Sequence, residues 1–411
     1  MAIDVSGNIY VSSPSQHAVS IYTASSGAVT ATAGTPGTAG SGGDSGPATN
    51  AYLNGPQGVA VDSSANLYIA DTKNCKVRLV ATTTGIISTF AGTGTCGSGG
   101  DGGPAISTLL YGPTGIAVDS SDNVYFAVSP WKAPGGSFGG AVYYVAYGSG
   151  TVTRLAGVAG GQCCSAPGLS TVLNDPNGVA VDSSGNVYVV DNFYQSIRLL
   201  TRSTGIMTTF MGTGTQGSTA DGAAAGPSSA VYSPVGMVAD AFGNIFIADP
   251  GDPNPIWQVV NVIYRVTLST GIVERYAGTG VMNTAGSSGD GGPARLAQLN
   301  SPQFLAVDAS GDVYIADSGN GAIRKVIPQT TSTATPTAAP TMAPTYNRVI
   351  SRLSALDAHP FFSFAPSPLL RRPGCHLHLR WHGDGVILWR RRCGQQWCAE
   401  RSARLGRGLD G

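Results

Sequence analysis

The chain has 411 residues, of which only 11% are charged, and its formal net charge of zero combines two unequal parts. Residues 1–345 contain 12 Lys and Arg against 19 Asp and Glu, about −7, whereas residues 346–411 contain 11 against 4, about +7. The acidic balance of the longer part argues against a phosphate-binding surface and so against a nucleic-acid partner, and the lack of any long apolar run argues against a membrane span.

A unit of short β-patterned runs recurs along the chain. In residues 178–200, three runs rich in Val, Ile, Leu and Tyr are separated by tight polar turns, which is typical of an antiparallel meander. The aspartate that closes the first run marks six copies of the unit: Asp4, Asp62, Asp119, Asp182, Asp240 and Asp308. A period this long, with several strands in each copy, predicts a β-propeller.

A fourth run follows the first three in five of the six copies, at Ala28–Gly34, Ile86–Gly92, Thr151–Gly157, Ile206–Gly212 and Ile272–Gly278. We therefore predict an all-β fold over residues 1–327, a six-bladed propeller of four-stranded antiparallel blades with an incomplete last blade. Met1 lies inside a repeat, which indicates a shortened N-terminus, and a strand from upstream of Met1 is one way to complete the sixth blade.

The chain changes character after the last repeat. Residues 328–345 are rich in Thr and Pro, which predicts either an extended, O-glycosylated stalk or a plain linker. Residues 346–411 contain eleven arginines and no lysine, without a persistent strand or helix period. We interpret this segment as a disordered basic tail or as an out-of-frame translation.

Glycine-rich links join consecutive units. SGGDSGPATNAYLNGP at 41–56, SGGDGGPAISTLLYGP at 98–113 and SSGDGGPARLAQLNSP at 287–302 have the same pattern. With these links, the chain resembles the NHL-repeat β-propellers, in the subgroup that also occurs in teneurin-like cell-surface proteins. The resemblance covers residues 1 to about 327 and implies six blades around a central channel, but this fold has many unrelated functions.

Two sets of aspartates could bind a cation or fold the chain. The six aspartates that mark the repeats precede S-S-G-N or similar residues, where Asp caps a turn, and we prefer this interpretation to a carboxylate ring. A second aspartate ends the next strand at Asp71, Asp191, Asp249 and Asp317, but Ser13 and Val128 interrupt that ring. The GDGG links lack the alternating acids of a calcium loop, so we expect structural turns there.

No catalytic constellation stands out in the repeats. The resemblance brings to mind amidating lyases of this repeat family, which hold zinc through histidines at the propeller centre. Residues 1–345 contain only His17, so that zinc site cannot be assembled. We therefore predict that the chain is not an enzyme and binds no metal or cofactor.

Four cysteines lie in the repeats. Cys75 and Cys96 flank one hairpin, so we consider a disulfide between them, whereas the adjacent Cys163 and Cys164 are harder to place. Together with the Thr/Pro segment they favour an oxidising, extracellular or cell-surface location, although the chain has no N-x-S/T sequon.

Two units have long insertions between their second and third strands, on the face that carries the links. The insertions at 129–141 and 250–261 each contain one tryptophan, and the corresponding turn of unit four contains two aromatic residues. Exposed aromatics on a rigid scaffold make good binding anchors, although each Trp could instead pack over its own loop. The candidate ligand-binding residues are Trp131, Phe138, Phe193, Tyr194 and Trp257.

These observations predict a monomeric, non-enzymatic recognition scaffold that binds a protein or glycan through this face. The alternative from another class is a propeller-type hydrolase or lyase. RNA binding, as in some intracellular relatives, is disfavoured by the acidic balance of the repeats.

Overall fold

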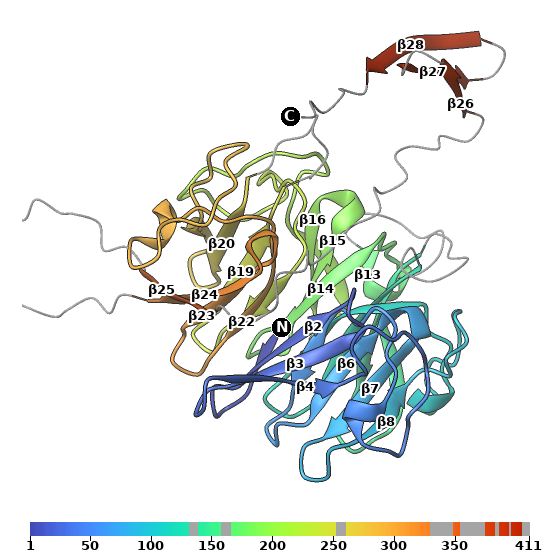
Figure 1. Ribbon diagram of the computed structural model, residues 1–411, viewed down its shortest axis with the longest axis vertical. Coiled ribbons are helices and arrows are strands. Elements are labelled where there is room, and N and C mark those ends of the chain that lie inside the picture. The colour runs from blue at the N-terminus through green and yellow to red at the C-terminus, as the bar shows by residue number, and fades with distance from the viewer. Residues whose placement is uncertain are drawn as a thin grey trace, which may run out of the picture. The chain divides into compact units, whose positions relative to one another are not determined.

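The computed structural model describes residues 1–130, 139–157, 166–251 and 260–328, and the backbone of four later strands between 348 and 404. Regular structure in these residues consists of antiparallel β-strands and single 3-10 turns of three residues each (Figure 1). None of the helices in this part of the chain is long and apolar enough to cross a membrane.

The strands form six successive blades and one separate sheet, with the following bounds. Blade 1 contains β1 (Ala2–Ile3), β2 (Ile9–Ser13), β3 (Ala18–Thr23) and β4 (Ala28–Ala33); blade 2 contains β5 (Val59–Val61), β6 (Leu67–Asp71), β7 (Lys76–Ala81) and β8 (Ile86–Ala91). Blade 3 contains β9 (Gly112–Val118), β10 (Val124–Ser129), β11 (Ala141–Val145) and β12 (Val152–Ala156); blade 4 contains β14 (Pro176–Val181), β15 (Val187–Asp191), β16 (Ser196–Thr201), β17 (Ile206–Met211) and the short β13 (Ala166–Pro167) beside β17. Blade 5 contains β18 (Met237–Ala239), β19 (Asn244–Asp249), β20 (Val262–Thr267) and β21 (Ile272–Ala277); blade 6 contains β22 (Pro302–Val307), β23 (Val313–Asp317), β24 (Ala322–Ile327) and β25 (Arg348–Leu353).

The first strands of the blades form a closed ring. Each contacts the first strand of the next blade, in the order β1, β5, β9, β14, β18, β22, and β22 contacts β1 again. A buried cluster that includes Met1 and Ile9 from blade 1 and Ala306 and Ile323 from blade 6 fills the last junction. The six-bladed, four-stranded propeller predicted from the repeats is thus confirmed.

The fourth strand of blade 6 comes from an unexpected place. β25 pairs antiparallel with β24 and comes from residues beyond the Thr/Pro-rich segment. The sixth sheet is therefore four-stranded without a strand from upstream of Met1, which corrects the closure that we considered. A second compact unit, Ser363–Gly411, contains a separate sheet of β26 (Cys375–His382), β27 (Val386–Cys393) and β28 (Gln396–Arg404), where the sequence indicated no strand pattern.

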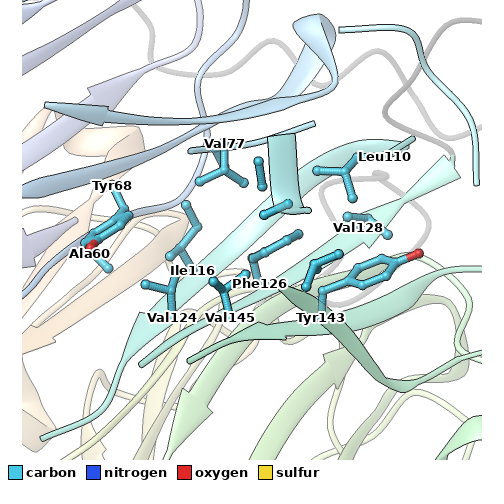
Figure 2. Close-up of a cluster of buried hydrophobic side chains, with 14 of the residues drawn as sticks. Ala60, Tyr68, Val77, Leu110, Ile116, Val124, Phe126, Val128, Tyr143 and Val145 are labelled. Atoms are coloured by element: carbon cyan, nitrogen blue, oxygen red, sulfur yellow. The ribbon is translucent and has the colours of Figure 1, made fainter. Parts of the chain in front are cut away.

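The hydrophobic core lies between neighbouring blades. Figure 2 shows the cluster between blades 2 and 3, where Val77 and Leu110 face Phe126 and Tyr143. The Phe126 and Tyr143 rings stack with their centroids 5.6 Å apart. Because each sheet has period-2 alternation, the residues of one face meet the next blade and those of the other face meet the preceding blade, so both faces are apolar.

The turns between first and second strands are capped by the repeat aspartates. Asp62 Oδ1 accepts the backbone N–H of Ser64 at 3.0 Å and of Asn66 at 2.8 Å, and its Oδ2 accepts from Asn66 Nδ2 at 2.9 Å. The same bonds recur at the other copies, commonly with a tyrosine hydroxyl six residues on as a further donor. The turn-capping role predicted for these six carboxylates is confirmed.

The links connect each blade to the next one. In the first link, Ala48 O accepts from Gly34 N at the end of β4, and Ala48 N donates to Gly85 O before β8. The acidic residue of the GDSG sequence, Asp44, accepts from Arg78 Nη2 on β7 at 2.7 Å and from Thr89 on β8 at 2.7 Å. The conserved shape of the link within this chain therefore serves to join the outer strands of consecutive blades.

Glycines at the start of the first strands allow the blades to approach closely. A Cβ on Gly236 would lie 2.2 Å from Gln303 O of the next blade, and one on Gly115 would lie 2.3 Å from Asn177 O. Real Cβ atoms do not come this close to backbone oxygen, so any side chain here must push the ring open.

We expect Gly236→Ala to lower the free energy of unfolding by about 1–3 kcal/mol, the usual cost of overpacking a close contact. Chemical denaturation of the purified chain measures this. Gly226→Ala is the matched control, since nothing lies within 4 Å of a Cβ built there. Equal stability of the two variants would show that the ring is not as tight as the contacts indicate.

Candidate functional site

The link face is the side of the propeller formed by the links and the turns between second and third strands. Backbone bonds join these two sets of loops, as from Lys73 N to Asn54 O and from Phe193 N to Asn174 O. The two other turns of each blade also bond to one another, for example Thr82 N to Asn66 Oδ1, and form the opposite face. The predicted location of the long insertions on the link face therefore follows from hydrogen bonds of the described residues.

The central channel contains a cavity of about 180 Å³. Its walls are the first strands of all six blades, with Gly, Ala, Val, Ile, Leu, Met and Phe residues only. No ionisable side chain lines this cavity, and the described residues include no cluster of three or more His, Cys, Asp or Glu able to hold a metal. Chemistry has to be sought at the link face instead.

The aspartate that ends the second strand anchors the link in blades 2 and 6. Asp71 accepts from Asn54 N at 2.7 Å and, at Oδ2, from Asn74 Nδ2 at 2.8 Å and Arg78 Nη1 at 3.4 Å. In blade 6, Asp317 has the same partners in Asn300, Asn320 and Arg324, at 2.7, 2.7 and 3.4 Å. Both carboxylates are fully buried, and both of their oxygens are satisfied.

Blade 4 departs from this arrangement. Asp191 is equally buried, and its Oδ1 accepts from Asn174 N at 2.9 Å, but its Oδ2 accepts no hydrogen bond from the described residues. The donor is missing because Tyr194 stands three residues after the aspartate, where blades 2 and 6 have Asn. In blade 5, by contrast, Asp249 accepts from three backbone N–H groups.

A second carboxylate lies next to Asp191. Asp175 belongs to the link before β14 and has a left-handed backbone, φ +60°, at a position where blade 2 has Gly55. The Ser129 hydroxyl, at the end of β10 in the neighbouring blade, donates to Asp175 Oδ1 at 2.7 Å. We call Ser129, Asp175, Asp191, Phe193 and Tyr194 the blade-4 site.

Burial and charge give the two carboxyls different properties. Burial, followed by the negative charge of Asp175, raises the pKa of Asp191 to about 8, although Asn174 and Arg198 act in the opposite direction. The equivalent Asp71, with its Asn and Arg donors, has its pKa raised only to about 6. Asp191 is therefore mostly protonated at neutral pH, whereas Asp175 is only partly buried.

Aromatic side chains lie on the same turn. Phe193 is 52% exposed, and its ring meets that of Tyr194 edge to face with centroids 5.7 Å apart. Of the residues predicted to bind a ligand, Phe193 and Tyr194 thus belong to the blade-4 site, and Trp131, Phe138 and Trp257 lie outside the described residues. Cys75 and Cys96, the pair considered from the sequence, form a disulfide with their Cα atoms 5.3 Å apart.

Tyr194→Asn tests the missing donor through pH dependence. Because the pKa of Asp191 is raised on folding, the folded chain binds more protons than the unfolded chain between about pH 4 and pH 8, so its contribution lowers stability as pH rises through that window. The Asn side chain should lower this pKa and flatten the decline, and we expect a gain of about 1 kcal/mol at pH 8. Denaturation at pH 4.5, 6 and 8 measures both, with Tyr194→Ala, which adds no donor, as the control; a slope as steep as in the parent chain would contradict the assignment.

Six four-stranded blades around a channel define the chain as a β-propeller. Family profiles for the Teneurin NHL domain, at residues 4–98, and the NHL repeat, at 173–194 and 299–326, match its sequence. The chain is an NHL-repeat β-propeller, and its likeness to teneurins is limited to the first of these ranges.

Three similar proteins place the chain among known propellers. Protein SUPPRESSOR OF QUENCHING 1, chloroplastic, of Arabidopsis thaliana is 28% identical over 294 residues, 68% of this chain; the chain spans about a quarter of that protein's length, 26%. A solved gluconolactonase from Xanthomonas campestris is 13% identical with a TM-score of 0.48, over 76% of this chain and 79% of that one. A virginiamycin B lyase from Staphylococcus aureus is 13% identical with a TM-score of 0.45, over 79% of each chain.

The prediction that this chain is not an enzyme is wrong as an exclusion. By their titles, two of the solved proteins that share its fold are a lactonase and a lyase, so the lack of a histidine zinc centre does not remove catalysis. At this identity the likeness shows the fold alone and assigns no reaction. Sequence reasoning also missed Ser129, Asp175 and Asp191 as a group; the signal was the Tyr at 194 where other units have Asn.

Proposed function

We propose that this NHL propeller is a hydrolase or lyase whose substrate binds at the blade-4 site. The observation that carries the proposal is the pair of carboxyls, Asp175 and Asp191, that lie close together in contrasting environments. Acid–base enzymes commonly separate the pKa values of two carboxyls in this way, and strongly perturbed groups concentrate at functional sites.

Asp175 has the properties of a general base. It is partly exposed, so a substrate can reach it, and the hydroxyl of Ser129 fixes one of its oxygens. In hydrolysis, Asp175 would take a proton from water as the water oxygen attacks the substrate, and return it to the leaving group. Asp191 is buried behind it and would position the substrate or Asp175 through hydrogen bonds.

Turnover assays with esters, lactones and amidated peptides test the proposal. We expect Asp175→Asn to lower kcat/KM by at least about a hundredfold, the usual contribution of a general base. Asp101→Asn is the matched control, because Asp101 also lies in a link but contacts Arg154 outside the site. The lack of turnover of every substrate, or equal activity of the two variants, would remove the proposal.

A second candidate is recognition of a protein or glycan partner through the same face. The exposed ring of Phe193 favours it, since solvent-exposed aromatics on a rigid scaffold are typical binding anchors. The disulfide between Cys75 and Cys96 supports an extracellular or cell-surface location for either function. A partner captured by the parent chain and lost with Phe193→Ala, in the absence of turnover, would favour this candidate.

A further inference from the structure

The donor missing from blade 4 indicates what its ligand contains. In blades 2 and 6 the Asn after the aspartate donates twice: Asn74 Nδ2 to Asp71 Oδ2 and to Gly40 O at 2.6 Å, and Asn320 Nδ2 to Asp317 Oδ2 and to Gly286 O at 2.7 Å. An N–H donor of this size therefore fits between the aspartate and the link. At Tyr194 the chain supplies none.

The arginine of the third strand does not take over this role. Arg78 and Arg324 donate to the equivalent Oδ2 atoms, but Asp191 Oδ2 accepts from no described residue, and Arg198 Nε points to Thr208 O at 3.4 Å. Two carboxyl groups, Asp175 and Asp191, thus lie near the single cation Arg198. When both are ionised, these three groups carry a net charge of −1.

We propose that the blade-4 site binds a primary ammonium group, which donates to Asp191 Oδ2 in the place of the missing Asn. The inference rests on the location given by the proposed function and adds the class of its ligand. An ammonium group has three N–H donors and a positive charge, so it satisfies the buried oxygen and neutralises the surplus of carboxylates. Phe193 and Tyr194 add aromatic rings to which a cation is attracted.

Binding of ethylammonium chloride to the full chain tests this inference by calorimetry or NMR titration, without any need for turnover. n-Propanol has the same shape without charge, and tetramethylammonium has the charge without an N–H donor. We expect ethylammonium to bind at least about tenfold more tightly than either, because a charge-assisted hydrogen bond to a buried oxygen is lost in both.

Two variants locate the binding. Tyr194→Asn supplies the internal donor found in blades 2 and 6 and should weaken ethylammonium binding at least about tenfold, and Asp191→Asn should do the same. Tyr194→Ala supplies no donor and should retain most of the affinity. Equal binding of the three probes, or binding unchanged in Tyr194→Asn, would overturn the inference.

The outcome separates this inference from the proposed function. Ethylammonium binding that depends on Asp191, without turnover of any substrate, would support the ammonium site and remove the hydrolase or lyase. Turnover that depends on Asp175, without ammonium binding, would retain the enzyme and overturn the amine.

Discussion

Arg324→Ala is expected to lower the free energy of unfolding by about 3–5 kcal/mol, the cost of breaking a buried ion pair by removing one partner. The Arg324 side chain is fully buried, with its Nη2 2.5 Å from Asp290 and its Nη1 3.4 Å from Asp317. It also donates to the link carbonyls of Ser288 and Gln298. The substitution leaves Asp317 ionised in an apolar environment and also frees the link before blade 6.

Two comparisons make the result specific. Arg154→Ala removes an arginine that is a third exposed, 3.9 Å from Asp101, and should cost less than about 1 kcal/mol. Adding Asp317→Asn to Arg324→Ala should recover part of the loss, because it removes the unpaired buried charge. Similar losses for Arg324→Ala and Arg154→Ala in denaturant titrations would contradict a stabilising role of the buried pairs.

Loss of the Cys75–Cys96 disulfide should cost about 3 kcal/mol, as expected for a closed loop of this length. The bond joins the turn after β6 to the link after β8, and Cys75 is buried with a left-handed backbone, φ +53°, at the end of the 3-10 turn Thr72–Asn74. Denaturation of Cys75→Ser/Cys96→Ser measures the loss without leaving a free thiol in the hairpin.

A reductant serves as an independent check on the disulfide. Dithiothreitol should shift the parent chain to the midpoint of the double variant and leave the double variant unchanged. If the reductant destabilises both proteins equally, its effect does not come from this bond. A double variant as stable as the parent chain would mean that blade 2 is held by its buried polar contacts alone.

The regular part of the fold could be predicted because each blade repeats the same local rules. The aspartate of Asp62–Asn66 bonds within its own turn, so the four or five letters around it already specify the turn. Strand alternation between such turns gives the meander, and six copies give the blades. These are interactions within about ten residues, which a sequence displays directly.

Contacts between distant residues could not be predicted in the same way. Arg78 and Asp44 are 34 residues apart, and Ser129 meets Asp175 across 46 residues and a blade boundary. The outer strand of blade 6, β25, follows a segment with no strand pattern, so nothing local assigns it to β24. Only comparison of the repeats with each other, position by position, would have drawn attention to Tyr194.

By itself, the sequence determined the number of blades, the turns between their strands and the face that carries the links, because hydrogen bonds between near neighbours depend on which residues follow one another. The tertiary structure alone decided that Asp191 is buried beside Asp175 with one oxygen unsatisfied, whereas Asp71 and Asp317 are fully paired. The physical reason is that burial and the sharing of a donor depend on how links and blades pack, and a one-residue change in a repeat has its effect on a partner that only folding brings near.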